Sequence, residues 1–129
     1  MPISGVEDDV EQAGKRMNGD AWQARANMTQ GDIAVGGKLA VADGRLTFRP
    51  HGLDRSIGGT AFDVLLTDIV SLDMAPRTFD LFNGGMRKRL RVRLVDGVEA
   101  LFVVNRVVKV GQRIAQSARA VGGAPIVRL

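Results

Sequence analysis

"GGKLAVADGRLTFRPHG", residues 36–52, is the stretch of sequence that decides the fold. Two runs of alternating apolar side chains flank an Asp43-Gly44 pair, and glycine readily takes the positive φ that a two-residue hairpin turn requires. With this turn, four apolar side chains share one face of the hairpin as two opposed pairs: Val41 with Leu46, and Leu39 with Phe48. Lys38 then lies opposite Arg49 on the other face. The stretch therefore predicts an antiparallel hairpin with one buried face.

Further strands are predicted on both sides of this hairpin. Residues 61–76 supply either one strand or two strands separated by a break at 66–68. Residues 89–95 alternate strictly between arginine and apolar side chains, and an Asp-Gly turn leads from them into the strand 98–105. Residues 21–28 fit a first strand, although their composition also favours a helix.

The turn at Asp96-Gly97 allows two registers. A two-residue loop places Phe102 beside Arg91, on the basic face of the strand. A three-residue loop with Gly97 in a bulge buries Phe102, which favours it. This second register predicts two apolar pairs: Val92 with Phe102, and Leu94 with Ala100.

The last predicted element is an amphipathic helix. We expect it to begin at an Asn105 N-cap and to stop at Gly122-Gly123. Its apolar stripe is formed by Val107, Val110, Ile114, Ala118 and Val121. We expect a polar N-terminal arm or frayed helix over 1–20, one domain over 21–121 and a C-terminal tail over 122–129. Strands followed by one covering helix make an α+β protein.

Length and composition exclude several classes of protein. The chain has 129 residues, which suits one domain, and it contains no cysteine, so disulfides and thiolate chemistry are excluded. No apolar run approaches the roughly 20 residues that span a bilayer, and the N-terminus lacks the layout of a signal peptide. These features predict a cytoplasmic protein, with peripheral attachment to the inner face of the membrane as an alternative. We expect no cofactor.

Four motifs in order resemble the GRAM domain family: "GGKLAVADGRLTFRPH", "LLTDIVSLD", "RLRVRLVDG" and "ALFVVNRVVKVGQRI". The resemblance covers roughly residues 25–118, and the composition, rich in Ala, Val, Arg and Gly, is typical of free-standing bacterial members. It implies a pleckstrin-homology-like fold, which is a bent, seven-stranded antiparallel sandwich or barrel capped by a C-terminal helix. The implied core consists of Leu39, Val41, Leu46, Phe48, Ile69, Val92 and Phe102.

The resemblance also implies a non-catalytic adaptor that binds proteins or membrane lipids. Phosphoinositide-binding members of the wider fold usually carry clustered bases between the first two strands. Here that region, 29–37, has one acid and no base, which argues against specific recognition of an inositol phosphate there.

The residues themselves give little support to catalysis or metal binding. His51 is the only histidine, and no neighbouring residue in the sequence forms a recognisable base-and-orienter pair with it. A metal site is not expected, because a chain with one histidine and scattered carboxylates lacks a ligand set.

Positive charge is concentrated in one part of the chain. Residues 1–86 hold 8 basic and 12 acidic side chains, whereas 87–119 hold 9 basic and 2 acidic ones. We call the densest part the basic stripe; it comprises Arg87, Lys88, Arg89, Arg91 and Arg93. Such a stripe is either a solvated face or a site for an anionic membrane or a nucleic acid. Nucleic acid is disfavoured, because there is no recognition-helix motif and no tyrosine, and the aromatics belong to the core.

A protein interface is the other candidate, and the one we expect. Leu101 and Val103 share the outward face with the arginines, and Phe79 and Phe82 are candidate anchors in the preceding loop. The sequence therefore predicts a module that binds a protein partner or a second copy of itself, with the anionic membrane as the alternative ligand.

Overall fold

The structure is a computed structural model that describes residues 21–31, 33–52, 58–75 and 88–129. The predicted N-terminal arm lies outside these ranges. So do Phe79, Phe82 and Arg87 from the predicted sites. In the region 21–28, for which both a strand and a helix are compatible with the sequence, a strand begins at Trp22.

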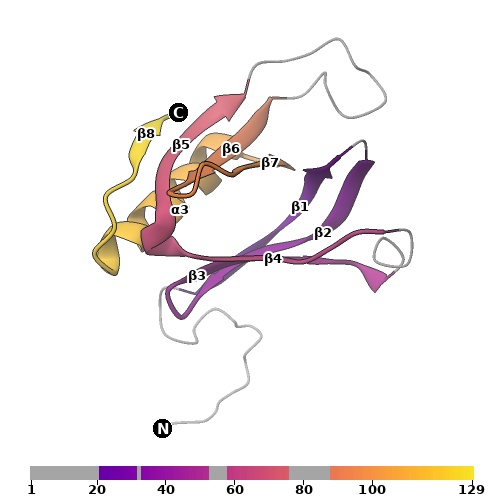
Figure 1. The fold of residues 1–129 in the computed structure, drawn as a ribbon, viewed down its shortest axis with the longest axis horizontal. Helices are drawn as coiled ribbons and strands as arrows, with labels where there is room; N and C mark the ends of the chain where they lie inside the picture. Colours follow the sequence, from indigo (N-terminus) through magenta and orange to yellow (C-terminus); the bar gives the residue numbers. More distant parts are fainter. Residues whose placement is uncertain (1–20, 32, 53–57, 76–87) are drawn as a thin grey trace, which may run out of the picture.

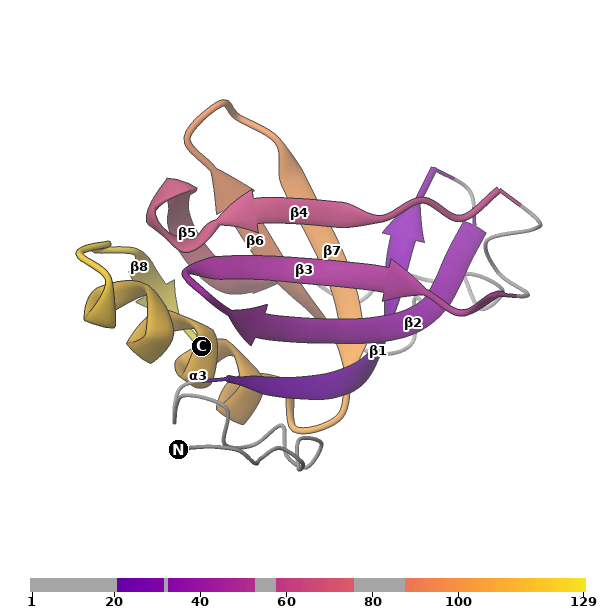
Figure 2. The same ribbon diagram turned by 90° about the horizontal axis from the view of Figure 1, so that it is seen from below.

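The described residues form a bent eight-stranded sheet and a helix at one end of it (Figure 1). The strands are β1 (Trp22–Gln30), β2 (Ile33–Ala42), β3 (Arg45–Pro50), β4 (Phe62–Leu65), β5 (Ile69–Ala75), β6 (Arg89–Leu94), β7 (Glu99–Val104) and β8 (Ile126–Arg128). Their spatial order is β4-β3-β2-β1-β7-β6-β5-β8. Strands β3 and β4 and the adjoining parts of β1 and β2 form one layer, seen from outside in Figure 2, and β5 to β8 belong to the other.

The hairpin predicted from residues 36–52 is confirmed. Val41 pairs with Leu46, Leu39 with Phe48 and Lys38 with Arg49. Asp43 and Gly44 both have positive φ, at 54° and 76°, which is the geometry that joins two strands with a two-residue loop. The predicted break at 66–68 is also confirmed, as the 3-10 helix η3 (Leu66–Asp68) between β4 and β5.

The long β1–β2 hairpin belongs to both layers. From Ala26 onward β1 pairs with β7 in the second layer, while from Gly37 onward β2 pairs with β3 in the first. Ala26 and Gly37 are paired with each other, so the sheet passes from one layer to the other at this point. Glycine is required there, because a Cβ at position 37 would overlap the Arg49 carbonyl and lie 2.8 Å from the Phe48 ring.

Three aromatic rings join the two layers in the core. Phe102 of β7 lies 5.9 Å from Phe48 of β3 and 5.8 Å from Phe62 of β4, measured between ring centroids. All seven core residues that the resemblance implied belong to the buried cluster. At the far end of β1, the Gln30 amide bonds both backbone groups of Thr60, accepting from its N–H (2.9 Å) and donating to its carbonyl (2.7 Å).

The turn between β6 and β7 has a loop of the predicted length but not the predicted pairs. Leu94 N–H donates to Val98 O across a three-residue loop, and Gly97 has a φ of 93°. The expected pairs of Val92 with Phe102 and Leu94 with Ala100 are wrong; Phe102 pairs with Leu90, and Ala100 with Val92. A shift of two residues keeps every side chain on its face, so Phe102 is buried as expected.

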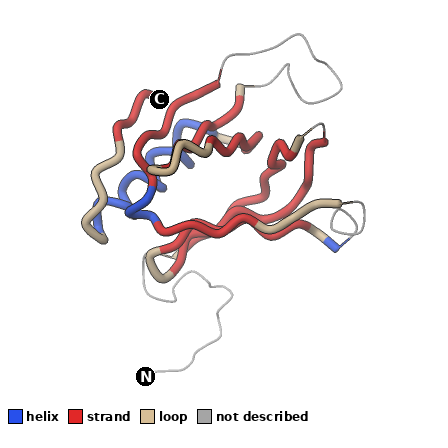
Figure 3. Tube along the Cα trace, viewed as in Figure 1, coloured by secondary structure: helices blue, strands red, loops and turns tan. Residues whose placement is uncertain are grey.

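Helix α3 (Val107–Ala120) lies at one end of the sheet and contacts η3, β5, β6 and β7 (Figure 3). The predicted cap at Asn105 is wrong: Arg106 occupies the N-cap position, in a left-handed conformation with φ 56° and no side-chain cap. The chain leaves β7 through this residue, so the helix starts one residue later. The predicted stop is confirmed, because Gly122 has a φ of 95° and Gly123 N–H donates to Ala118 O (2.8 Å).

The C-terminal segment is not only a tail, and β8 is an eighth strand that the sequence did not predict. It pairs in parallel with β5, and Val127 packs against the core. Leu129 fills the space left by Gly111 of α3, where a Cβ would lie 2.5 Å from its side chain. A three-residue strand is too short to leave a periodic pattern in the sequence.

Replacing Gly37 by alanine tests the passage between the layers. We expect Gly37→Ala to lower the free energy of unfolding by at least about 2 kcal/mol, because the new methyl group must displace backbone atoms of β3. Gly52→Ala is the matched control, since a Cβ there meets open space. Urea unfolding measures both, and equal stability of the two variants would contradict this account.

Candidate functional site

The basic stripe lies at the start of β6, and its described members differ in their surroundings. Lys88 is exposed just before the strand, and Arg89, Arg91 and Arg93 point outward from it. The alternation of the sequence predicted these orientations correctly. The neighbouring strands add carboxylates that the sequence analysis did not assign to this face.

Arg91 forms a two-pronged ion pair with Asp73 of β5. Its Nε and Nη2 atoms donate to the two carboxylate oxygens of Asp73, each at 2.8 Å. Both side chains are about four-fifths buried, so water screens the pair only partly. The hydrogen bonds from Arg91 hold the pKa of Asp73 below its usual value of 3.8 against the opposing effect of burial, and the pKa of Arg91 is raised in return.

Arg93 is paired as well, with Glu99 of β7. Its Nε atom donates to Glu99 Oε2 at 2.8 Å, on a more exposed part of the same face. Cross-strand pairing explains both contacts, because Asp73 lies directly opposite Arg91 and Glu99 directly opposite Arg93. Two of the arginines in the stripe are therefore neutralised by acids from other strands.

The two described apolar residues of the predicted interface differ in their exposure. Leu101 is half-buried and directly opposite Arg91, as part of the outward face. Val103 is only 9% exposed, so its prediction as an exposed interface residue is wrong. The residues beside Val103 on the neighbouring strands are also covered. The Nε atom of Arg89 on β6 is buried without a hydrogen-bond partner, and Ala75, which is paired with Arg89 on β5, is only 5% exposed.

Nothing in the described ranges assembles a catalytic or metal site around His51. The residue is exposed after β3, where its backbone N–H donates to Gly36 O (3.0 Å). Within the part of the chain that the structure describes, no group of three or more His, Asp or Glu residues is placed to hold a metal ion. In the same part of the chain, no helix has the length and apolar character needed to cross a membrane.

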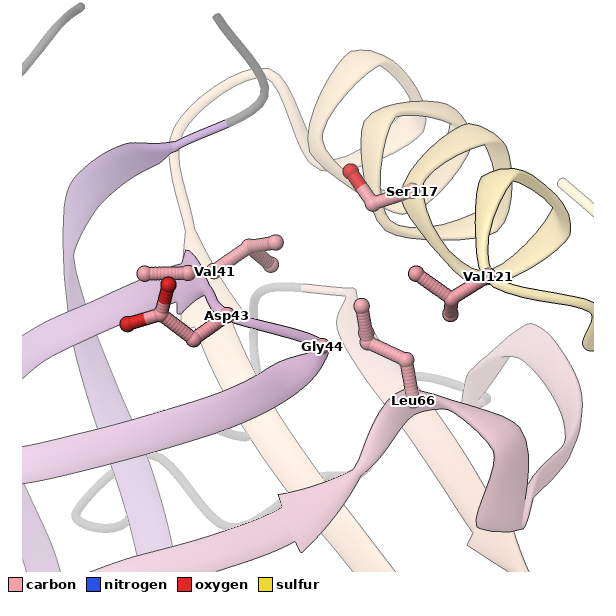
Figure 4. Close-up of a pocket in the computed structure, with 7 residues that line it drawn as sticks. Val41, Asp43, Gly44, Leu66, Ser117 and Val121 are labelled. Carbon is pink, nitrogen blue, oxygen red and sulfur yellow. The ribbon is translucent and has the colours of Figure 1, made fainter. Parts of the chain in front are cut away.

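A shallow pocket of about 310 Å³ lies between the β2–β3 turn and the end of α3 (Figure 4). Leu66 and Val121 point toward each other across it, and Ser117 lies on its helix side. The Asp43 carboxylate points away from the helix. The pocket therefore brings no acid, base and nucleophile together.

No protein-family model matches the chain, and no curated protein matches it. Solved structures do. The C-terminal domain of an unknown protein from Leishmania infantum is similar over 84% of this chain and 89% of its own, with 10% identity and a TM-score of 0.59. The Spt16D–Pob3N heterodimer is similar over 84% of this chain, with 12% identity and a TM-score of 0.53; the match spans 53% of that neighbour's chain.

The chain has a pleckstrin-homology-like fold. The bent antiparallel sheet and the C-terminal helix agree with the architecture that the sequence predicted, with β8 added. At these identities the likeness is one of fold alone.

The ion pair of Arg91 and Asp73 predicts how the fold responds to acid. Because the pKa of Asp73 is lowered by folding, the pair stabilises the protein fully above the usual value of 3.8, and this contribution is lost as the pH falls through the lowered value. We expect Arg91→Gln to raise the pKa of Asp73, measured by carboxyl NMR, and to lower stability at neutral pH by about 1 kcal/mol.

Arg93→Gln is the control, because Arg93 acts on Asp73 through charge alone whereas Arg91 also donates the hydrogen bonds. Its effect on the pKa of Asp73 is expected to be smaller. An equal effect from both variants would rule out the hydrogen bonds as the main cause.

Proposed function

We propose that the chain is a non-enzymatic binding module of the GRAM type that engages a protein partner or a second copy of itself. The proposed contact surface is the outer face of β5, β6 and β7 around Leu101. GRAM membership rests on the four sequence motifs, and it remains a prediction. The Spt16D–Pob3N neighbour supports the proposal in one respect, since its name describes two protein chains in one assembly.

The observation that carries this proposal is the pairing of the arginines beside Leu101. The bidentate contact with Asp73 fixes the guanidinium of Arg91, a residue paired across the strands with Leu101, and Arg93 is held by Glu99. Pre-ordered arginines around an apolar side chain are typical of protein interfaces, where arginine is enriched and lysine depleted. Their neutralisation makes the face less suited to a purely anionic surface.

Attachment to an anionic membrane is the weaker alternative. Of the described bases in the stripe, only Lys88 and Arg89 lack an acidic partner among the described residues. At about 1 kcal/mol for each base near the surface, two of them supply about 2 kcal/mol, which is too little for stable attachment. The unpaired bases support weak, salt-sensitive contact at most.

Leu101→Lys is the variant that tests the proposed surface. We expect it to abolish concentration-dependent self-association, measured by light scattering after size-exclusion chromatography, because a charge replaces the apolar centre of the interface. Leu65→Lys on β4 is the control, since Leu65 is exposed on the other layer. If the wild-type chain is monomeric, the same pair of variants is compared for copurifying proteins, with loss expected for Leu101→Lys alone.

Cosedimentation with anionic vesicles separates the two proposals. A monomeric chain that pellets with vesicles, and stops pelleting when Lys88 and Arg89 are changed to Gln, would replace the protein interface by the membrane. Equal copurification by both leucine variants would also count against the proposed surface.

A further inference from the structure

Three basic side chains form a row across the outer face of the other layer. Arg25 of β1 is paired with Lys38 of β2, and Lys38 is paired in turn with Arg49 of β3. All three are exposed, and all three point away from the core, because their neighbours Leu39 and Phe48 point into it. This cationic row runs at right angles to the strands, across the face that Figure 2 views.

The cationic row has no acid to neutralise it within the described ranges. The ion pairs there involve Arg45, Arg91 and Arg93, and none of these belongs to the row. The acid in the adjacent row of the same face is Asp63, and its Oδ1 already accepts from Arg45 Nε at 2.7 Å. The row is therefore a concentration of unpaired positive charge on the outer surface of a regular sheet.

The row is unfavourable for the fold itself. Directly opposed side chains on neighbouring strands have their Cβ atoms about 5 Å apart, and like charges at that distance destabilise a sheet. Here the conflict occurs twice in succession, between Arg25 and Lys38 and between Lys38 and Arg49. Directly opposed like charges that no other contact compensates are typical of a functional site.

We infer that the cationic row is a binding site for an acidic, extended segment of a partner protein, which crosses the strands and places its carboxylates on the three bases. The outward positions next to the row are small or polar: Gln23, Asn27, Gly36, Ala40 and Thr47, with the exposed His51 just after the end of β3. They leave room for a peptide backbone. They offer no Phe, Tyr or Trp ring for base stacking and no apolar anchor for a bilayer, which disfavours nucleic acid and membrane. This site lies on the opposite layer from Leu101 and is independent of the interface proposed there.

The test uses a fluorescent peptide of about twelve residues with glutamate at alternate positions, since alternate side chains of an extended chain share one face. We expect the full chain to bind it, and the triple variant Arg25→Gln, Lys38→Gln, Arg49→Gln to bind at least about tenfold more weakly, with affinity falling as salt is raised. The matched control is Lys88→Gln, Lys109→Gln, Arg119→Gln, which removes the same charge from exposed sites elsewhere.

A second measurement separates binding from stability. Lys38→Gln removes both like-charge contacts, so we expect it to raise the melting temperature while it weakens peptide binding. Leu101→Lys is expected to leave peptide binding unchanged, which distinguishes a failure of this site from a failure of the Leu101 surface. No binding, or equal loss in the row and control variants, would overturn the inference. So would row-dependent binding of oligothymidylate or of phosphatidylserine vesicles in place of the peptide.

Discussion

The fold depends on the close approach of β2 to β3 at Gly37. There the glycine lies against the Arg49 carbonyl and the Phe48 ring, at a distance that leaves no space for a side chain. At the paired position, Ala26, β1 changes its role and joins β7. One hairpin thus serves two layers, and the sheet encloses a core instead of remaining open. The contacts of Phe102 with Phe48 and Phe62 are possible only because this passage brings β7 over β3 and β4.

The helix α3 and the C-terminal residues cover the apolar side chains at the open end of the bent sheet. A sheet that folds over itself exposes apolar side chains at its end, and α3 covers them with Ile114, Ala115 and Ala118. The helix then stops at Gly122, which reverses the chain and lets β8 extend the sheet beside β5. Leu129, which follows β8, packs against α3 at Gly111. Helix stop, final strand and helix surface therefore form one connected unit.

The sequence predicted the elements well wherever a local rule was sufficient. The Asp43-Gly44 turn, the break at 66–68 and the helix stop each follow from residues that are adjacent in the chain. The incorrect predictions concern the pairing of Phe102, the N-cap at Arg106, the burial of Val103 and the existence of β8. Each of these depends on which strand or residue lies alongside. An alternating pattern specifies which face a side chain occupies, but it does not specify its partner or what covers it.

The sequence was least informative about which charges are paired, because the pattern of a strand does not specify the strand that lies beside it. Counted along the chain, residues 87–119 are strongly basic and residues 1–86 acidic. The pairing of the strands distributes these charges differently: β5 and β7 bring Asp73 and Glu99 to Arg91 and Arg93 of β6, whereas β1, β2 and β3 align Arg25, Lys38 and Arg49 with one another. Electrostatic interaction falls off with distance in space, so pairing decides which charges remain available. Among the described residues, the three bases that strand pairing aligns on one face therefore come from the acidic part of the sequence.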